Sequence, residues 1–302
     1  MTGTRRMRFV GVSTGSSSIM TVFPVWSRML GLDAELVGLD VPLDSPPQTY
    51  RDVVRTLAED PACVGALVTT HKIALYDAAG DLFDSLDTFA REVGEVSSVA
   101  VRDGRLRGAA KDPVTAGLAL EAVLADDHFS RGGHVLCLGG GGAGTAIGWY
   151  LARRPDAPAA MTVVDTSPAR LAHLREVVQP HADRTDLRTL GAAGADVAQL
   201  LAALPPHSLV VNATGMGKDR PGSPVPDGAR WPQDAVVWEL NYRGSLEFLA
   251  QARAQQEARG LTVVDGWEYF VHGWTRVIAD VFDLDLDEAT VRELSAAARD
   301  LR

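Results

Sequence analysis

The hexapeptide Gly139–Gly144, with glycine at its first, third and sixth positions, is the segment of this sequence with the clearest chemistry. An apolar run precedes it and an amphipathic stretch follows, so the pattern is strand, loop, helix. In such a loop the first glycine permits a tight turn, the second lets the backbone approach a pyrophosphate, and the third lets helix and strand pack closely. The N-terminus of the helix offers free N–H groups to phosphate. The sequence therefore predicts a dinucleotide site at Gly139, Gly141, Gly142, Ala143 and Gly144.

A second predicted strand, Met161–Asp165, ends in a carboxylate 21 residues after Gly144. This spacing is close to that of the acid that binds the adenosine ribose hydroxyls, and a carboxylate there repels a 2′-phosphate. NAD is therefore the predicted cofactor in preference to NADP, although Arg170 weakens that preference. The alternative is that Asp165 only caps the helix that begins near Ser167.

Short apolar runs and longer amphipathic stretches alternate along the chain, which predicts an α/β fold with mostly parallel sheets. Asp-Gly between two apolar runs predicts a hairpin that closes the first half. In the first half we expect strands at 7–12, 34–40, 63–68, 97–101 and 106–109, and helices at 22–30, 48–57, 72–79 and 83–93. In the second half we expect strands at 134–139, 161–165, 208–212, 235–240 and 261–264. We expect helices there at 113–124, with Asp112 as N-cap, and at 142–154, 167–178, 195–203, 244–258, 266–282 and 287–301.

The composition excludes several classes of protein. The chain has 302 residues, 46% of them hydrophobic, which is enough for two cores. Its net charge of −10 argues against nucleic-acid binding. Cys63 and Cys137 lie in apolar runs and are expected to be buried, reduced thiols, and zinc-ligand spacing is absent, so no metal is expected. Neither a signal peptide nor an apolar run of about 18 residues is present, so we expect a cytoplasmic protein without membrane contact.

Lys72 follows the buried strand predicted at 63–68, and ligands of α/β proteins bind at the carboxyl ends of strands. By itself, a lysine at a helix start is usually solvated. However, the chain resembles the shikimate/quinate dehydrogenase family over nearly its whole length. The segment Gly65-Ala-Leu-Val-Thr-Thr-His71-Lys72 is similar to the family's N-V-T-x-P-x-K, which carries the catalytic lysine, and Asp112 falls on the aspartate paired with it. The resemblance implies that Lys72 is the general acid/base; burial would lower its pKa and Asp112 would raise it.

Other segments of the chain resemble elements of the same family. Gly15-Ser16-Ser-Ser18 is similar to the S-x-S element that binds the substrate carboxylate, although a helix-capping turn is the alternative. Gly94-Glu-Val-Ser97-Ser98 is similar to G-A-V-N-T, Val211–Gly217 to the N-A-T-x-x-G loop beside the nicotinamide, and Glu239-Leu-Asn-Tyr242 to D-x-x-Y. The resemblance implies substrate contacts from Ser16, Ser18, Thr69, Ser97 and Tyr242, and further cofactor contacts from Asn212, Ala213 and Thr214.

The resemblance also implies a domain plan and an activity. A substrate-binding domain would span 1–111, a Rossmann dinucleotide-binding domain 112–265, and helices in 266–302 would pack back on the first domain. The activity would be that of an NAD(P)-dependent alcohol dehydrogenase, acting as a monomer or homodimer.

The departures from the family pattern concern the substrate. The family's two asparagines fall on Ala66 and Ser97, and its glutamine falls on Gly273. A site that loses hydrogen-bonding side chains usually loses the substrate that satisfied them, so we expect a related cyclic polyol or its ketone, from specialised metabolism, rather than shikimate. Two alternatives stay open: a non-catalytic paralogue that senses a metabolite, and a methylene-folate-type dehydrogenase on the same two-domain plan.

Overall fold

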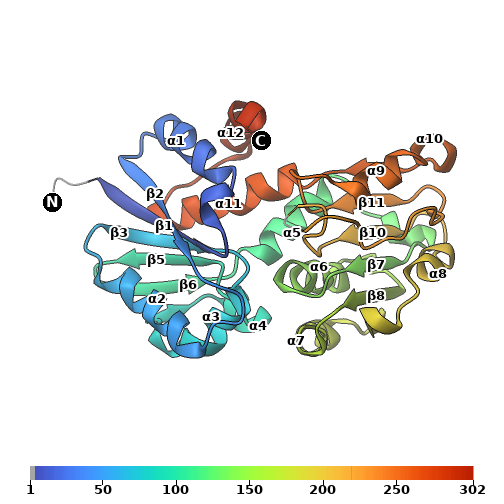
Figure 1. Ribbon diagram of the computed structural model, residues 1–302, viewed down its shortest axis with the longest axis horizontal. Helices are drawn as coiled ribbons and strands as arrows, with labels where there is room; N and C mark the ends of the chain where they lie inside the picture. The colour runs from blue at the N-terminus through green and yellow to red at the C-terminus, as the bar shows by residue number, and fades with distance from the viewer. Residues whose placement is uncertain (1–3, 219, 302) are drawn as a thin grey trace. The chain divides into compact units, whose positions relative to one another are not determined.

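The computed structural model describes residues 4–218 and 220–301, and the chain divides into two compact units. The first unit runs to Thr115 and resumes at Val271, and the second comprises Ala116–Phe270. Figure 1 shows one sheet with flanking helices in each unit, so the predicted α/β class is confirmed.

The sheet of the first unit is mixed, in the order β2-β1-β3-β5-β6-β4. β1 pairs in parallel with β2 and β3, whereas β3, β5 and β6 are successively antiparallel, and β5 and β6 form the hairpin that Asp-Gly predicted. Its strands are β1 (Arg5–Gly11), β2 (Ala34–Asp40), β3 (Cys63–Val68), β4 (Ser85–Leu86), β5 (Ser98–Arg102) and β6 (Arg105–Ala109).

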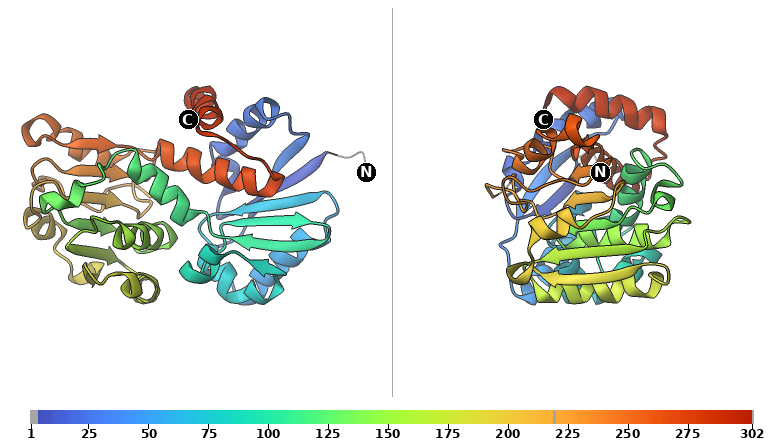
Figure 2. Two further views of the ribbon diagram at one scale, coloured as in Figure 1. Left: turned by 180° about the vertical axis from the view of Figure 1, so that it is seen from behind. Right: turned by 90° about the vertical axis from the view of Figure 1, so that its right-hand side faces the viewer.

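Helices cover both faces of this sheet. Side chains of α2 and α3 build the core on one face with β3, whereas Trp274 of α11 packs edge-on against Phe9 of β1. α12 lies alongside α1, as Figure 2 also shows, and the buried indole N–H of Trp26 donates to the carbonyl of Leu294 at 2.8 Å. Leaving that donor unpaired would cost about 1–3 kcal/mol. The helices are α1 (Ile19–Met29), α2 (Pro47–Glu59), α3 (Lys72–Ala79), α4 (Thr88–Val93), α11 (Trp267–Phe282), which begins in the second unit, and α12 (Glu288–Ala298).

One prediction in this unit was wrong. The segment 83–93 is not a single helix, because Ser85–Leu86 pairs with β6. Asp87 then starts α4 by accepting a hydrogen bond from the N–H of Ala90 at 2.6 Å. Asp87 thus follows β4 directly and is the N-cap of α4.

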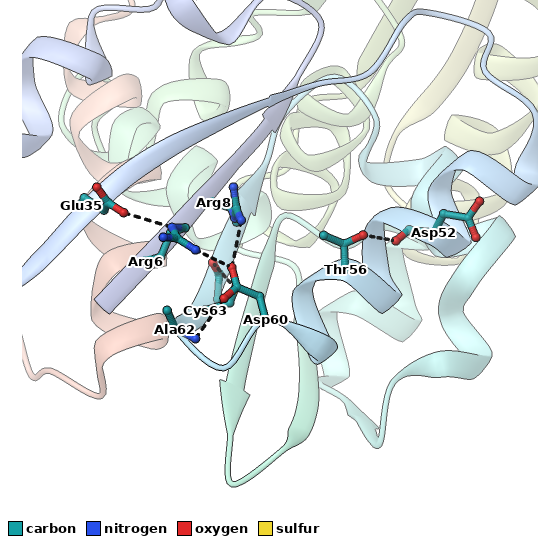
Figure 3. A network of polar contacts seen from close by, with 9 residues as sticks. Arg6, Arg8, Glu35, Asp52, Thr56, Asp60, Ala62 and Cys63 are labelled. Carbon is teal, nitrogen blue, oxygen red and sulfur yellow. Dashed lines mark hydrogen bonds and ion pairs between the residues drawn. The ribbon is translucent and has the colours of Figure 1, made fainter. Parts of the chain in front are cut away.

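A network of ion pairs ties the amino ends of β1 and β3 together (Figure 3). The carboxylate of Asp60 accepts from the guanidinium groups of Arg6 and Arg8, each at 2.9 Å, and from the N–H of Ala62 at 3.0 Å. The Ala62 N–H, Arg8 and Arg6 outweigh burial and lower the pKa of Asp60. This network lies at the end of the strands opposite to Lys72, so its charges serve the fold.

All strands of the second unit are parallel, in the order β12-β11-β10-β7-β8-β9. Numbered along the chain this order is 6-5-4-1-2-3, that of a Rossmann fold, as predicted. The strands are β7 (Val135–Leu138), β8 (Ala160–Asp165), β9 (Asp186–Gly191), β10 (Leu209–Asn212), β11 (Val236–Glu239) and β12 (Thr262–Val264). The sequence patterns missed β9, an edge strand that alternates between exposed and half-buried residues.

Most helices of this unit lie between its strands in the sequence. One prediction needs correction: the helix expected at 244–258 begins only at Glu247 and is divided into α9 and α10. The helices are α5 (Asp112–Glu121), which begins in the first unit, α6 (Gly142–Arg153), α7 (Pro168–Val178), α8 (Val197–Ala202), α9 (Glu247–Arg253) and α10 (Gln256–Arg259).

Two expectations from composition can be compared with the structure. Cys63 and Cys137 are buried free thiols, and burial raises the pKa of Cys137 to about 12. Within residues 4–218 and 220–301, every helix is too short or too polar to cross a membrane.

Candidate active site

Lys72 and Asp112 are brought together although 40 residues separate them. Each is the first residue of a helix, α3 for Lys72 and α5 for Asp112, and each follows a strand of the same sheet, β3 and β6 respectively. The ammonium of Lys72 donates a hydrogen bond to Oδ2 of Asp112. The side chains are 19% and 8% exposed, respectively. The geometry gives a charge-assisted, largely buried pair at one edge of the sheet.

The sequence left open whether burial or Asp112 dominates the pKa of Lys72. The surroundings of the side chain decide this. Burial alone would lower the pKa of Lys72, but the carboxyl groups of Asp112 and Glu95 outweigh burial and raise it. Lys72 is therefore an ammonium at neutral pH. Glu95 was not among the predicted site residues, because one glutamate in a short motif gives no signal of its burial.

The serine-rich turn and Thr69 lie at the same edge of this sheet, since they follow the carboxyl ends of β1 and β3. Ser16 is exposed and its hydroxyl donates to the carbonyl of Ser13 at 3.1 Å. Ser18 precedes α1 but its side chain makes no capping hydrogen bond, which argues against the capping alternative. Thr69 donates to the carbonyl of Val10 at 3.3 Å.

Asp40, to which no sequence pattern pointed, holds this turn in place. Asp40, the last residue of β2, accepts hydrogen bonds from the N–H and the hydroxyl of Thr14, at 2.8 and 2.5 Å. These bonds lower the pKa of Asp40. A carboxylate at a strand end was the available signal, but the sequence does not reveal which turn it would meet.

Ser97 is buried, and its hydroxyl oxygen accepts the N–H of Lys111 at 2.7 Å. Its own N–H donates to the carbonyl of Ala109 at 3.0 Å. Both bonds fix the backbone just before Asp112, so Ser97 positions the carboxylate partner of Lys72. Its contact with substrate stays a prediction.

The glycine loop has the packing that each of its positions requires. Gly139 has φ +108°, and a Cβ there would meet the carbonyl oxygen of Ala213 at 2.5 Å. A Cβ on Gly144 would meet the carbonyl oxygen of Gly139 at 2.1 Å. Gly141 is the N-cap of α6; among the described residues, no side chain caps that helix and no heavy atom lies within 4 Å of a Cβ built there. The backbone thus leaves space at the first turn of α6, formed by Gly142 and Ala143, as a dinucleotide phosphate requires.

Asp165 is 7% exposed and turned towards the backbone. Its Oδ2 accepts the N–H of Gly140 and its Oδ1 accepts the N–H of Ser167, both at 2.7 Å. The helix that follows is capped by Ser167, whose hydroxyl accepts the N–H of Arg170, and not by Asp165 itself. Asp165 therefore ties the glycine loop to the carboxyl end of β8.

A buried polar network shapes the loop after β10, where Asn212, Ala213 and Thr214 lie. Asn212 accepts the N–H and the hydroxyl of Thr214, at 3.1 and 2.7 Å, and donates to Oε2 of Glu239 at 2.7 Å. Oε1 of Glu239 accepts the N–H and the amide of Asn241, at 2.8 and 2.7 Å. Burial outweighs these bonds and raises the pKa of Glu239 to about 7. Glu239 and Asn241 belong to the segment that resembles D-x-x-Y, but they were not among the predicted site residues, because their contacts depend on β10 and β11 being neighbours.

Tyr242 follows this network in the second unit. Its ring packs against Phe270 at 4.5 Å and Trp267 at 5.6 Å between centroids. The structure therefore groups Lys72, Asp112, Ser97, Thr69 and the serine-rich turn in one unit, and the glycine loop, Asp165, the Asn212 loop and Tyr242 in the other.

Comparison with known proteins gives relatives of one kind. No protein-family model matches the chain. The shikimate dehydrogenase (NADP+) of Methylobacterium radiotolerans is 32% identical over 280 residues, which cover 89% of this chain and 88% of the relative. Shikimate 5-dehydrogenase from Thermus thermophilus, solved in complex with NADP(H) and shikimate, is 25% identical with a TM-score of 0.70, over 97% of this chain and 99% of its own. Quinate dehydrogenase from Corynebacterium glutamicum, solved with NAD, shares the fold at 21% identity and a TM-score of 0.72, over the same fractions.

Proposed function

Because the chain belongs to the shikimate dehydrogenase family of NAD(P)-dependent oxidoreductases, we propose that it interconverts an alcohol and a ketone on a cyclic polyol. The observation that carries this proposal is the hydrogen bond between Lys72 and Asp112 in a largely buried site. A solvated helix-start lysine would have neither a buried partner nor a raised pKa.

In the proposed reaction, Lys72 moves the proton. In ketone reduction its ammonium donates a proton to the carbonyl oxygen, and in alcohol oxidation its neutral amine accepts the hydroxyl proton. Asp112 orients the ammonium and stabilises its charge. When bound, a nicotinamide would supply the hydride to the carbonyl carbon in reduction, or accept it from the alcohol carbon in oxidation. The glycine loop, Asp165 and Asn212–Thr214 are the residues proposed to hold that cofactor, and the open space above Gly141 fits its phosphates.

The substrate is proposed to differ from shikimate. Ala66 is fully buried in β3, and Gly273 in α11 has no side chain, so neither replaces the amide of the family pattern. The hydroxyl oxygen of Ser97 already accepts a backbone N–H. Positions 66, 97 and 273 therefore lack the amide side chains that would hydrogen-bond the ring hydroxyls of the family's substrate. This favours a substrate whose ring carries different substituents. Ser16, Ser18, Thr69 and Tyr242 remain as proposed substrate contacts.

A screen of cyclic polyols and their ketones, with NADH or NADPH absorbance as the readout, tests this function. We expect at least one compound to be turned over with kcat/KM above that of shikimate, and shikimate itself to stay below about 10⁴ M⁻¹s⁻¹. Lys72→Ala is the matched control for background reduction. Shikimate turnover at or above that value would contradict the proposed substrate class, and no turnover with any compound would contradict the activity.

A further inference from the structure

Glu95 is a buried acid that the proposed reaction does not use. It follows α4, directly after Gly94 at the left-handed cap of that helix, and it is 2% exposed. Across residues 4–218 and 220–301, no hydrogen-bond donor lies within reach of its Oε1. A buried, unsatisfied carboxyl oxygen costs free energy, so its presence calls for a reason beyond packing.

The backbone places Glu95 beside both members of the Lys72–Asp112 pair. The next residue, Val96, donates its N–H to the carbonyl oxygen of Lys72 at 3.1 Å. Ser97 accepts the N–H of Lys111, the residue before Asp112, at 2.7 Å. The segment 95–97 therefore touches the chain at Lys72 and again just before Asp112.

The charged groups that act on Glu95 come from three helix starts. Burial is the largest influence and raises the pKa of Glu95 to about 8, Asp112 and Asp87 add to the rise, and Lys72 opposes it. In turn, Glu95 raises the pKa of Lys72. The ammonium of Lys72 thus lies among several carboxyl groups, and ionising all of them would cost free energy because like charges repel.

The family pattern G-A-V-N-T has alanine where this chain has Glu95. An alanine methyl would fill a buried position without adding charge. The glutamate adds a titratable group to the same place.

We propose that Glu95 is a third ionisable member of the Lys72–Asp112 site, a positioning residue whose protonation state controls how firmly Lys72 holds its proton. The kinetic consequence rests on the proposed role of Lys72. While Glu95 is neutral, Lys72 is held mainly by Asp112. Once Glu95 ionises, a second negative charge stabilises the ammonium, so the neutral amine that alcohol oxidation requires is less populated.

The chain contains three lysines, Lys72, Lys111 and Lys218, so the state of Lys72 can be observed without any substrate. We would label lysine with ¹³C at Cε, assign the three NMR signals with Lys111→Arg and Lys218→Arg, and titrate from about pH 6.5 to about pH 9.5. The Lys72 signal of the wild type should move with an inflection near pH 8, where Glu95 loses its proton. In Glu95→Gln the inflection should vanish, and in Glu59→Gln, which changes an exposed glutamate of the same unit, it should remain.

Glu95→Ala is the second variant, because alanine is the family residue at this position and removes the charge without needing a partner. A Lys72 signal that stays flat in the wild type, or that keeps the inflection in Glu95→Gln or Glu95→Ala, would overturn the proposal. Because the titration needs no turnover, its result tests the proposal for Glu95 independently of the substrate screen. With an active compound in hand, alcohol oxidation by Glu95→Gln above about pH 8 should exceed that of the wild type by up to about tenfold, because the neutral amine of Lys72 is then more populated.

Discussion

At the scale of single residues, the site depends on how burial and charge compete at Lys72. Burial disfavours the ammonium, yet two neighbouring carboxyl groups favour it more strongly. The same lysine on the surface would keep an ordinary pKa. We therefore expect the proposed pair of Lys72 and Asp112 to act as a unit, and single substitutions should reveal this.

Lys72→Ala should lower kcat by about 10²–10⁴-fold, because it removes the proposed general acid/base. The dissociation constant of the cofactor should barely change, because Lys72 belongs to the first unit and the glycine loop to the second. Steady-state kinetics and cofactor titration check both quantities.

Asp112→Asn keeps the shape of the side chain and removes its charge. It should also lower kcat, and its loss should not add to that of Lys72→Ala in the double variant, since both act on one proton. Unchanged turnover in Lys72→Ala would mean that the chemistry happens elsewhere.

Asp165 sets the expected choice of cofactor. Its carboxylate at the end of β8 disfavours a 2′-phosphate, so kcat/KM should be at least several-fold higher with NAD than with NADP. The relative from Methylobacterium is named for NADP, so this prediction separates the two proteins. Asp165→Asn should narrow the ratio by improving use of NADP. A wild-type preference for NADP would show that Asp165 does not bind the ribose hydroxyls. Its role would then be structural, through its hydrogen bonds to the N–H groups of Gly140 and Ser167.

At the scale of elements, the turn from β7 into α6 offers a matched pair of glycine substitutions. Gly144→Ala would push a methyl group into the carbonyl oxygen of Gly139, so we expect a loss of stability of about 1–3 kcal/mol. Gly141→Ala meets no atom within 4 Å and has φ −74°, an ordinary value, so the protein should keep its melting temperature. Cofactor binding should weaken nevertheless, because the methyl group occupies the space proposed for phosphate.

Thermal unfolding and cofactor titration of the two glycine variants distinguish these effects. If Gly141→Ala bound the cofactor as tightly as the wild type, the proposed phosphate position would be wrong.

At the scale of the whole molecule, two buried glutamates make stability depend on pH. In the folded state the pKa of Glu95 is raised to about 8 and that of Glu239 to about 7, whereas 4.5 is their ordinary value. Between these values the folded state binds more protons than the unfolded state, so stability falls as pH rises and the loss is complete above the folded pKa. The melting temperature should therefore decrease from about pH 6 to about pH 9.

Other groups limit stability on the acid side. The pKa of Asp60 is lowered by its bonds to the Ala62 N–H and to Arg8 and Arg6, and burial lowers the pKa of His71. Both contributions are lost as pH falls. Calorimetry of the wild type and Glu95→Gln tests the alkaline side, where the variant should show a smaller decrease. A melting temperature that rises from about pH 7 to about pH 9 would contradict the assignment.

The sequence by itself determined most of the helices and strands and the glycine turn between β7 and α6. Strand, loop and helix around Gly139–Gly144 are local, because the glycine spacing and the apolar period are set within about 30 residues. The alternation along the chain was enough to predict two α/β parts, and the segment like N-V-T-x-P-x-K was enough to name Lys72. Errors arose where local propensity competed with pairing, as at Ser85–Leu86, which joins β6 instead of a helix.

The resemblance predicted that Lys72 and Asp112 pair, but only the tertiary structure showed the packing that joins them and the other charges that act on them. Asp112 lies 40 residues from Lys72, and Glu239 lies 27 residues from Asn212, so their contacts exist only because β3 and β6, or β10 and β11, belong to one sheet. The burial of Glu95 and the direction of the Lys72 pKa follow from the same packing. Electrostatic effects depend on distance and on removal from water, and neither quantity is written in the order of residues along the chain.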